Sequence, residues 1–262
     1  MAQLENRVWI GGVPVTRFTA SEWARLMVAD WQCKKERGGP PKVVTTANGQ
    51  VISLFAQDAA YRSAVLAADY IAADGMSVVF ASQLATDAPL PERVATTDWF
   101  HDAARAASRH GIRFYLLGAT PDANARAVSR ARRLYPFLQL AGAHDGYFDR
   151  DAVADLAEEI SASEADILWI GVGNPEQVQL AHVFKELAPG LTWVRTCGGL
   201  FDFLSGSHSR APAAVQAVGM EWAYRVALEP RRLAWRYATT NVQAAYQMAT
   251  KSQGRSRGGS LH

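Results

Sequence analysis

Short apolar runs alternate with amphipathic stretches from the N-terminus to about residue 209. Apolar residues at helical spacing predict helices in the amphipathic stretches, and a small hairpin is expected over 8–15. The apolar runs are rich in β-branched and aromatic residues, which predicts strands at 43–44, 70–71, 113–117, 138–143, 166–172 and 191–196. Strands that alternate with helices predict an α/β fold with a mostly parallel, doubly wound sheet.

Three helix starts can be placed from local sequence signals. Thr19 with Glu22 three positions later is typical of a capping box. Thr96 or Thr97 is expected to cap a later helix, and Pro121 is expected in the first turn of the helix after that.

The pattern changes at Arg210. From 210 to 251 no further strand is evident, and the sequence predicts a helical appendage in which arginines stand among tryptophans and tyrosines. Residues 252–262 are rich in Gly, Ser and Arg and are expected to be a disordered tail. The predicted organisation is therefore an α/β core over 1–209, the appendage over 210–251 and the tail.

Polar side chains gather where two successive predicted strands end. Thr46 and Asn48 follow the strand at 43–44, and Asp74 with Gly75 follows the strand at 70–71. In an open parallel sheet the crevice beyond the carboxyl ends of the strands binds ligands, so these side chains are expected to face one crevice. The same residue types are common helix caps and turn residues, and the residues alone leave that alternative open.

Composition narrows the class of protein. The chain has 262 residues, of which 49% are hydrophobic, and its net charge of +2 is too small to argue for a nucleic-acid partner. Cys33 and Cys197 have neither a disulfide framework nor metal-ligand spacing, which fits a reduced compartment. No signal peptide is visible, and the most apolar stretch, 64–85, is interrupted by Asp69 and Asp74. We expect a cytoplasmic protein that meets a membrane only from the side.

Motifs for other chemistries are weak. Gly171 and Gly173 follow a predicted strand, but the third glycine position of a dinucleotide fingerprint holds Glu176. Asp149 and Asp151 form a literal D-x-D, the kind of pair that can hold a metal and a diphosphate, but they are expected to open a helix. No G-x-S-x-G elbow indicates a hydrolase.

A set of short segments in a specific order resembles the WecG/TagA/CpsF family of bacterial glycosyltransferases. The resemblance covers about 8–240, and its segments are TTAN, ADG, ERVATTD, FYLLGATP, HDGYF, GVGNPEQ, CGGLFDFLSG and RAPAAVQAVGMEWAYRVALEPRRLAWRY. It implies a Rossmann-like core and an inverting glycosyltransferase that needs no metal and no cofactor. In this family the sugar usually passes from a UDP-sugar to a sugar linked through diphosphate to a polyprenyl lipid.

The resemblance also implies roles for single residues. Asp74 of ADG corresponds to the general base, with Arg93 of ERV and Gln177 of NPEQ beside it as further catalytic residues. The residues that it implies for substrate binding are Thr46, Asn48, Tyr147, Asp202, Arg225, Arg232 and Arg236. Without a metal, arginines and backbone N–H groups at helix N-termini would offset the charge of the departing UDP.

Departures from the family pattern leave the donor sugar open. Gly49 and Gln50 stand where the family commonly has Pro and Glu, and Val178 stands where it has Glu. The transferred sugar is therefore N-acetylmannosamine, glucose or a related sugar. Two other classes also remain at this point, a Rossmann-like NAD(P) oxidoreductase and a non-catalytic scaffold at the membrane.

The expected partners are the UDP-sugar donor, the lipid-diphosphate-linked acceptor and the inner face of the cytoplasmic membrane. The sequence predicts no nucleic-acid partner, and it leaves homo-oligomerisation open. The appendage arginines Arg225, Arg232 and Arg236 are spaced seven and four residues apart, so they can share one helical side if Pro230 does not break the register. Their expected target is the diphosphate of the lipid acceptor.

Overall fold

The computed structural model describes residues 6–253 apart from 210, 213–214, 216–219 and 229, and it leaves undescribed the side chains of 222, 225, 228 and 230–239. The strands in chain order are β1 (Arg7–Ile10), β2 (Val13–Thr16), β3 (Lys42–Ala47), β4 (Tyr70–Ala73), β5 (Arg113–Gly118), β6 (Gln139–His144), β7 (Ile167–Gly171) and β8 (Trp193–Thr196). The helices are α1 (Ala20–Arg37), α2 (Gly49–Gln57), α3 (Ala59–Leu66), α4 (Met76–Ala85), α5 (Thr96–His110), α6 (Pro121–Leu134), the 3-10 turn η1 (Arg150–Ala152), α7 (Val153–Ala162), α8 (Glu176–Leu187), α9 (Leu200–Leu204), α11 (Glu221–Leu228) and α12 (Pro230–Thr250).

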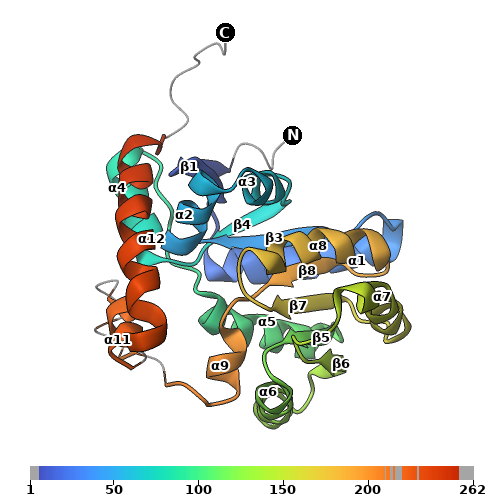
Figure 1. Ribbon diagram of the computed structural model, residues 1–262. Coiled ribbons are helices and arrows are strands. Elements are labelled where there is room, and N and C mark those ends of the chain that lie inside the picture. The colour runs from blue at the N-terminus through green and yellow to red at the C-terminus, as the bar shows by residue number, and fades with distance from the viewer. Residues whose placement is uncertain (1–5, 210, 213–214, 216–219, 229, 254–262) are drawn as a thin grey trace.

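Strands β3 to β8 form one sheet in the order β4-β3-β8-β7-β5-β6 (Figure 1). Every pairing in this sheet is parallel, which confirms the predicted fold class. The predicted hairpin is the antiparallel pair of β1 and β2, and its Thr16 hydroxyl accepts the Ile71 N–H of edge strand β4 at 3.2 Å. Because the strands are parallel, their carboxyl ends meet at one edge of the sheet.

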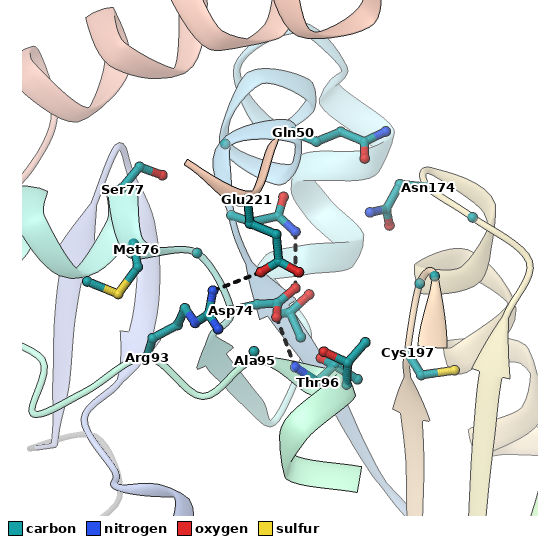
Figure 2. Close-up of a pocket in the computed structure, with 18 of the residues that line it drawn as sticks. Gln50, Asp74, Met76, Ser77, Arg93, Ala95, Thr96, Asn174, Cys197 and Glu221 are labelled. Atoms are coloured by element: carbon teal, nitrogen blue, oxygen red, sulfur yellow. Dashed lines mark hydrogen bonds and ion pairs between the residues drawn. The ribbon is translucent and has the colours of Figure 1, made fainter. Parts of the chain in front are cut away.

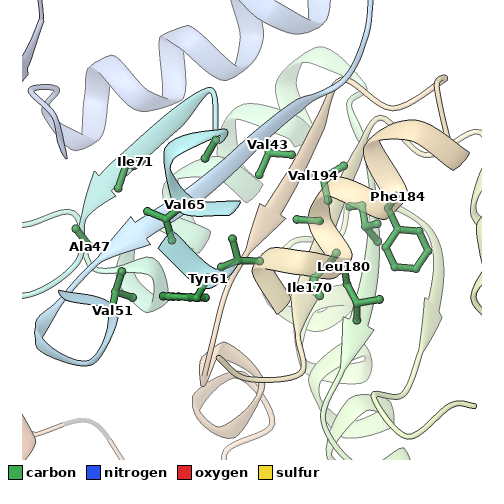
Figure 3. Close-up of a cluster of buried hydrophobic side chains, with 14 of the residues drawn as sticks. Val43, Ala47, Val51, Tyr61, Val65, Ile71, Ile170, Leu180, Phe184 and Val194 are labelled. Atoms are coloured by element: carbon green, nitrogen blue, oxygen red, sulfur yellow. The ribbon is translucent and has the colours of Figure 1, made fainter. Parts of the chain in front are cut away.

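Helices cover both faces of the sheet. Successive side chains of a strand point to opposite faces, so the apolar strands present a buried surface on each side. On one face Val43, Ile170 and Val194 pack with residues of α2, α3, α7 and α8 (Figure 3). On the other face an aromatic cluster lies against α1 and α5, and the ring centroids of Trp99 and Trp193 are 6.2 Å apart. The two cores hold the strands rigidly behind the edge where their carboxyl ends meet.

Two of the predicted helix starts are confirmed. Thr19 is the N-cap of α1, where its side chain and that of Glu22 satisfy each other's backbone N–H groups. Pro121 opens α6 behind the capping side chain of Thr120.

The start of α5 differs from the prediction that Thr96 or Thr97 caps it. The N-cap residue is Ala95, and no side chain of this segment caps the helix. The N–H of Thr96 donates instead to the Asp74 carboxylate at 2.9 Å, so an acidic side chain from the end of β4 takes the place of the local cap. The local sequence does not predict this cap, because Asp74 lies at the end of β4 and not in the segment that opens α5.

The C-terminal helix α12 lies along α2 (Figure 1). Ala244 of α12 is 1% exposed and belongs to the first core, and the Gln57 amide donates to the Gln243 side chain at 2.6 Å. A truncation after Ser209 would therefore uncover an apolar face of α2, so single substitutions are the cleaner way to test this region.

The chain continues past α12 onto the hairpin. The Gly11 N–H donates to the Ser252 hydroxyl at 3.0 Å, and Gln253 forms an antiparallel bridge with Trp9. Ser252 and Gln253, which the sequence assigns to the tail, therefore contact the hairpin at Gly11 in its turn and at Trp9 in β1. The rest of the predicted tail, 254–262, lies outside the described residues.

Ala244→Asp tests whether α12 belongs to the folded core. A carboxylate at this buried position would lack a partner, so we expect the free energy of unfolding to fall by roughly 3 kcal/mol or more and the melting temperature to fall with it. Ala249→Asp places the same charge at an exposed position of the same helix and serves as the control. Equal melting temperatures for the two variants would contradict the packing described.

Candidate active site

A cleft of about 650 Å³ lies at the carboxyl ends of β3, β4, β7 and β8 (Figure 2). This volume is within the range of small-molecule sites. The loop before α5 and the inner side of α12 complete its wall. The predicted site residues that line it are Thr46, Asn48, Asp74, Arg93, Gln177 and Asp202. The polar strand ends thus share one crevice, whereas the roles of these residues stay predictions.

Asp74 is fixed from several sides. Its backbone N–H donates to the Ala47 carbonyl at 2.9 Å, which ties the ends of β3 and β4 together. Its Oδ1 accepts the Thr96 N–H at 2.9 Å, and its Oδ2 lies 3.4 Å from the Asn48 Nδ2 (Figure 2). An ionised carboxylate has about four acceptor positions, so these contacts orient it and leave acceptor capacity toward the cleft.

Asn48 is both a helix cap and a cleft residue. Its Oδ1 accepts the Val51 N–H at 3.1 Å at the start of α2, while its Nδ2 faces Asp74. A Cβ atom on Gly75 would lie 3.3 Å from the Asn48 Cβ, so the two turns approach closely. The capping and the site interpretations of this residue therefore hold together.

Arg93 connects the loop before α5 to the C-terminal helices. Its Nη1 lies 3.0 Å from the Glu221 Oε2 of α11, and its Nη2 lies 3.4 Å from the Asp98 Oδ2. Its side chain is mostly buried. The ion pair with Glu221 brings a residue from the first turn of α11 to the wall of the cleft.

Gln177 joins two strand-end turns. It is 2% exposed, its Nε2 donates to the Asn174 Oδ1 at 3.1 Å, and its Oε1 accepts the Gly198 N–H at 3.1 Å. Asn174 also accepts the Tyr61 hydroxyl at 3.1 Å. The amide of Gln177 thus fixes the turn after β7 against the turn after β8; Figure 2 labels Asn174 and Cys197 of these turns.

Three further residues line the cleft, and of these Glu221 is not indicated by the sequence. Glu221 is the first letter of the segment EWAYR, which carried the resemblance without a role for this carboxylate. Asn174 is the N of NPEQ, and its contacts follow from the turn geometry alone. Cys197 lines the cleft as well, but burial raises the pKa of its thiol, so it is not an activated nucleophile.

The charges on the described lining are unbalanced. Asp74, Asp202 and Glu221 contribute carboxylates, whereas Arg93 is the one basic side chain among the described lining residues. An anionic ligand in this cleft therefore requires further positive groups, either side chains outside the description or backbone N–H groups at helix starts.

Four of the predicted substrate-binding residues are not placed at the cleft. Tyr147 is 76% exposed and does not line it. Arg225 lies in α11, and Arg232 and Arg236 lie in α12, but their side chains are outside the described residues. Because α11 ends at Leu228 and Pro230 opens α12, the three arginines do not share one continuous helix. Only Arg232 and Arg236 keep the predicted spacing on one helix.

The weaker motifs have structural explanations. A Cβ atom on Gly171 would lie 2.7 Å from the Phe201 ring, so this glycine makes room for a side chain of the core. The Asp149 carboxylate accepts the Asp151 N–H at the start of η1, which confirms the predicted helix start. Within the residues that the structure describes, no group of three or more His, Cys, Asp and Glu side chains is arranged to hold a metal ion.

The chain from residue 8 to 258 matches the model of the glycosyl transferase WecG/TagA/CpsF family. The protein belongs to this family and is therefore a glycosyltransferase, not an oxidoreductase or a non-catalytic scaffold. It is 34% identical over 194 residues to an N-acetylglucosaminyldiphosphoundecaprenol N-acetyl-beta-D-mannosaminyltransferase of Bacillus spizizenii. The aligned residues make up 74% of this chain and 73% of the relative. The enzyme of the same name from Bacillus subtilis is 32% identical over 191 residues, or 72% of this chain and 73% of the relative.

Gln177→Ala tests whether the joined turns matter for activity. The substitution leaves the Gly198 N–H without its acceptor, so we expect a loss of stability of about 1–3 kcal/mol and a loss in kcat/KM of at least about tenfold. Gln179→Ala on the exposed side of the same helix is the matched control. The expectation fails if Gln177→Ala keeps the transfer rate of that control.

Proposed function

We propose that this protein is an inverting glycosyltransferase that moves a sugar from a UDP-sugar to a sugar carried on polyprenyl diphosphate, in the synthesis of a cell-surface polysaccharide. The names of both relatives support the acceptor class, and they favour N-acetylmannosamine over glucose as the transferred sugar. The observation that carries the proposal is the Asp74 carboxylate, which is oriented by Thr96 and Asn48 inside the cleft.

Asp74 is the general base in this proposal. The acceptor hydroxyl loses its proton to the carboxylate while its oxygen attacks the anomeric carbon, and the bond from that carbon to the UDP oxygen breaks. Attack on the side opposite the leaving group inverts the configuration. Since Thr96 occupies Oδ1, the free positions of Oδ2 are those that take the proton.

The departing UDP gains negative charge that the protein has to offset. Arg93 stands in the cleft wall, and the turn at Asn174–Gln177 presents the N-terminus of α8. These groups face three carboxylates, so we assign the remaining positive charge to Arg225, Arg232 and Arg236 of the C-terminal helices. UDP-sugar is a co-substrate here, and the proposal includes no cofactor.

The reaction can be tested directly with the purified full-length protein. A panel of UDP-sugars, including UDP-N-acetylmannosamine and UDP-glucose, is incubated with a short-chain polyprenyl-diphosphate-linked N-acetylglucosamine, and the mass of the lipid product is followed. We expect one added sugar and stoichiometric UDP. Unchanged acceptor with every donor would reject the proposal.

Asp74→Asn tests the base. The amide keeps the shape and an acceptor for the Thr96 N–H but cannot take a proton, so we expect turnover to fall by roughly two to four orders of magnitude while UDP binding is largely kept. Asp155→Asn on the exposed surface of α7 controls for the loss of one charge. Near-wild-type turnover in Asp74→Asn would show that another group is the base.

Chelation tests the proposed independence from metal ions. We expect EDTA followed by gel filtration to leave the transfer rate unchanged, because arginines and backbone N–H groups take the role of the metal. If Mg²⁺ or Mn²⁺ restored an activity that EDTA removed, the proposed independence from metal ions would be wrong, and Asp149 and Asp151 would have to be reconsidered as ligands.

Two neighbouring helices at the cleft present apolar side chains to solvent. Val242 and Tyr246 of α12 are 73% and 63% exposed, and Phe80 and Leu84 of α4 are exposed as well. The two residues of each pair are four positions apart and therefore lie on one side of their helix. Among the described helices none is long and apolar enough to cross a membrane. We propose that these pairs, with the basic residues of α11 and α12, hold the protein at the inner membrane surface beside its lipid acceptor.

Val242→Glu combined with Tyr246→Glu tests the membrane contact. Two carboxylates on the apolar face should oppose binding to anionic lipid, so we expect the protein to be recovered in the supernatant when it is sedimented with phosphatidylglycerol vesicles. Ala125→Glu with Ser129→Glu places the same charges at the same spacing on exposed positions of α6. Equal vesicle binding by the two double variants would exclude α12 as the contact.

A further inference from the structure

The hydroxyl of Thr96 has no hydrogen-bonding role in the fold. Thr96 is the first residue of α5, and its N–H donates to the Asp74 Oδ1 at 2.9 Å. The N-cap of this helix is Ala95, so the Thr96 side chain does not cap it. Its Oγ1 is buried and has no hydrogen-bond partner among the described residues. The backbone of Thr96 therefore has a structural role in which its hydroxyl takes no part.

A buried hydroxyl without a partner requires an explanation. Such a group has lost its hydrogen bonds to water and gained none from the protein, which destabilises the fold. Most buried polar groups in proteins are hydrogen-bonded for this reason. Valine has the shape of threonine without the hydroxyl, so the stability of the fold alone would favour valine at this position.

The place of this hydroxyl sets it apart from the other unpaired groups. Thr96 is 4% exposed and lines the cleft, and a lining residue with so little exposed surface lies deep in it. The other buried side-chain atoms that lack a partner in the described part of the chain belong to residues outside this lining. Thr192 is one of them, and it precedes β8 at the edge of the sheet opposite the cleft.

Covalent geometry keeps the hydroxyl close to the proposed base. Three bonds separate the Oγ1 of a threonine from its own backbone nitrogen, so these two atoms are at most about 4 Å apart. The Thr96 nitrogen is itself hydrogen-bonded to the Asp74 carboxylate (Figure 2). No hydrogen bond to a described residue holds the side chain in one rotamer, so it can turn about χ1 toward a ligand without breaking one.

We propose that Thr96 is an acceptor-binding residue, whose hydroxyl forms a hydrogen bond with a second hydroxyl of the acceptor sugar. The inference rests on the proposed function, in which Asp74 takes the proton of the attacking hydroxyl. Hydroxyl groups stand on adjacent carbons of a sugar ring, so a sugar with one hydroxyl on Asp74 brings another close to Thr96. Both hydroxyls can donate and accept, so the pair satisfies the unpaired group of the protein.

This arrangement makes the acceptor site selective. A site that is built to hydrogen-bond a substrate hydroxyl discriminates against an analogue that lacks it, because the buried group of the protein is then left unpaired. Thr96 thus destabilises the free protein slightly and gains its partner in the complex. The same carboxylate contact that fixes α5 also places this hydroxyl next to the reacting group.

Thr96→Val tests the proposal through stability and activity together. The substitution removes the hydroxyl and keeps the β-branched shape and the N–H on Asp74. We expect the melting temperature to stay the same or rise, while kcat/KM for the acceptor falls by at least about tenfold and UDP binding stays near that of the wild type. Thr96→Ser keeps a hydroxyl and should retain most of the activity.

Thr192→Val is the matched control, because it removes another unpaired buried hydroxyl that lies outside the cleft lining. It should keep the kcat/KM of the wild type. Transfer by Thr96→Val at the rate of Thr192→Val would overturn the proposal. A melting temperature of Thr96→Val far below that of Thr192→Val would overturn it as well, since the hydroxyl would then have a partner within the protein.

Acceptor analogues test which substrate Thr96 binds. Each analogue lacks one hydroxyl of the acceptor sugar other than the attacking one. One of them should lose at least about tenfold in kcat/KM with the wild type and little with Thr96→Val, as in a double-mutant cycle. If every analogue loses the same factor with both proteins, Thr96 does not bind the acceptor and the proposal is wrong.

These outcomes separate the role of Thr96 from the proposed function. Failure of the wild type to transfer any sugar would reject the function itself. Transfer by the wild type that Thr96→Val leaves unchanged would reject only the role of Thr96.

Discussion

The hydrogen bond from the Thr96 N–H to the Asp74 Oδ1 connects the catalytic proposal to the fold. It exists because β3 and β4 end side by side, with the Asp74 N–H on the Ala47 carbonyl, and because α5 begins with a free backbone donor at that place. The start of a helix favours a negative charge, so the same contact stabilises α5 and keeps the carboxylate in one orientation. With a local cap on α5, the Asp74 side chain would be oriented by the Asn48 amide without the Thr96 N–H.

The cleft wall around this carboxylate carries further charged side chains. Arg93 and Glu221 form an ion pair in the cleft wall, which couples the loop before α5 to α11. The described lining of the cleft carries three carboxylates and one arginine, so in the proposed reaction the diphosphate requires further positive groups, which we assign to the C-terminal helices and to helix starts. In this arrangement the C-terminal helices complete the site.

Much of the fold and part of the site could be predicted from the sequence, because both depend on local patterns. The apolar runs gave the parallel strands, and the rule that ligands bind at carboxyl ends brought Thr46, Asn48 and Asp74 to one crevice. The cap on α5 was missed because it comes from Asp74, and Glu221 was missed because it reaches the cleft only through the packing of α11. The sequence assigns Ser252 and Gln253 to the tail because no local pattern shows their bonds to Gly11 and Trp9 of the hairpin.

Arg195 shows the limit of local patterns most clearly. In the sequence it interrupts the apolar run TWVRT, where an arginine is as compatible with an exposed strand end as with burial. Only the positions of Trp23, Trp99 and Thr45, which come from three distant segments, show that it is buried.

The most direct test of the account is a crystal structure of the protein with UDP and a short-chain lipid-diphosphate-linked acceptor. We predict the acceptor hydroxyl within about 2.6–3.2 Å of the Asp74 Oδ2, with the UDP diphosphate on the side of Asn174 and Gly198. An acceptor hydroxyl separated from Asp74 by more than one water molecule, with another basic side chain in contact with it, would contradict the central claim.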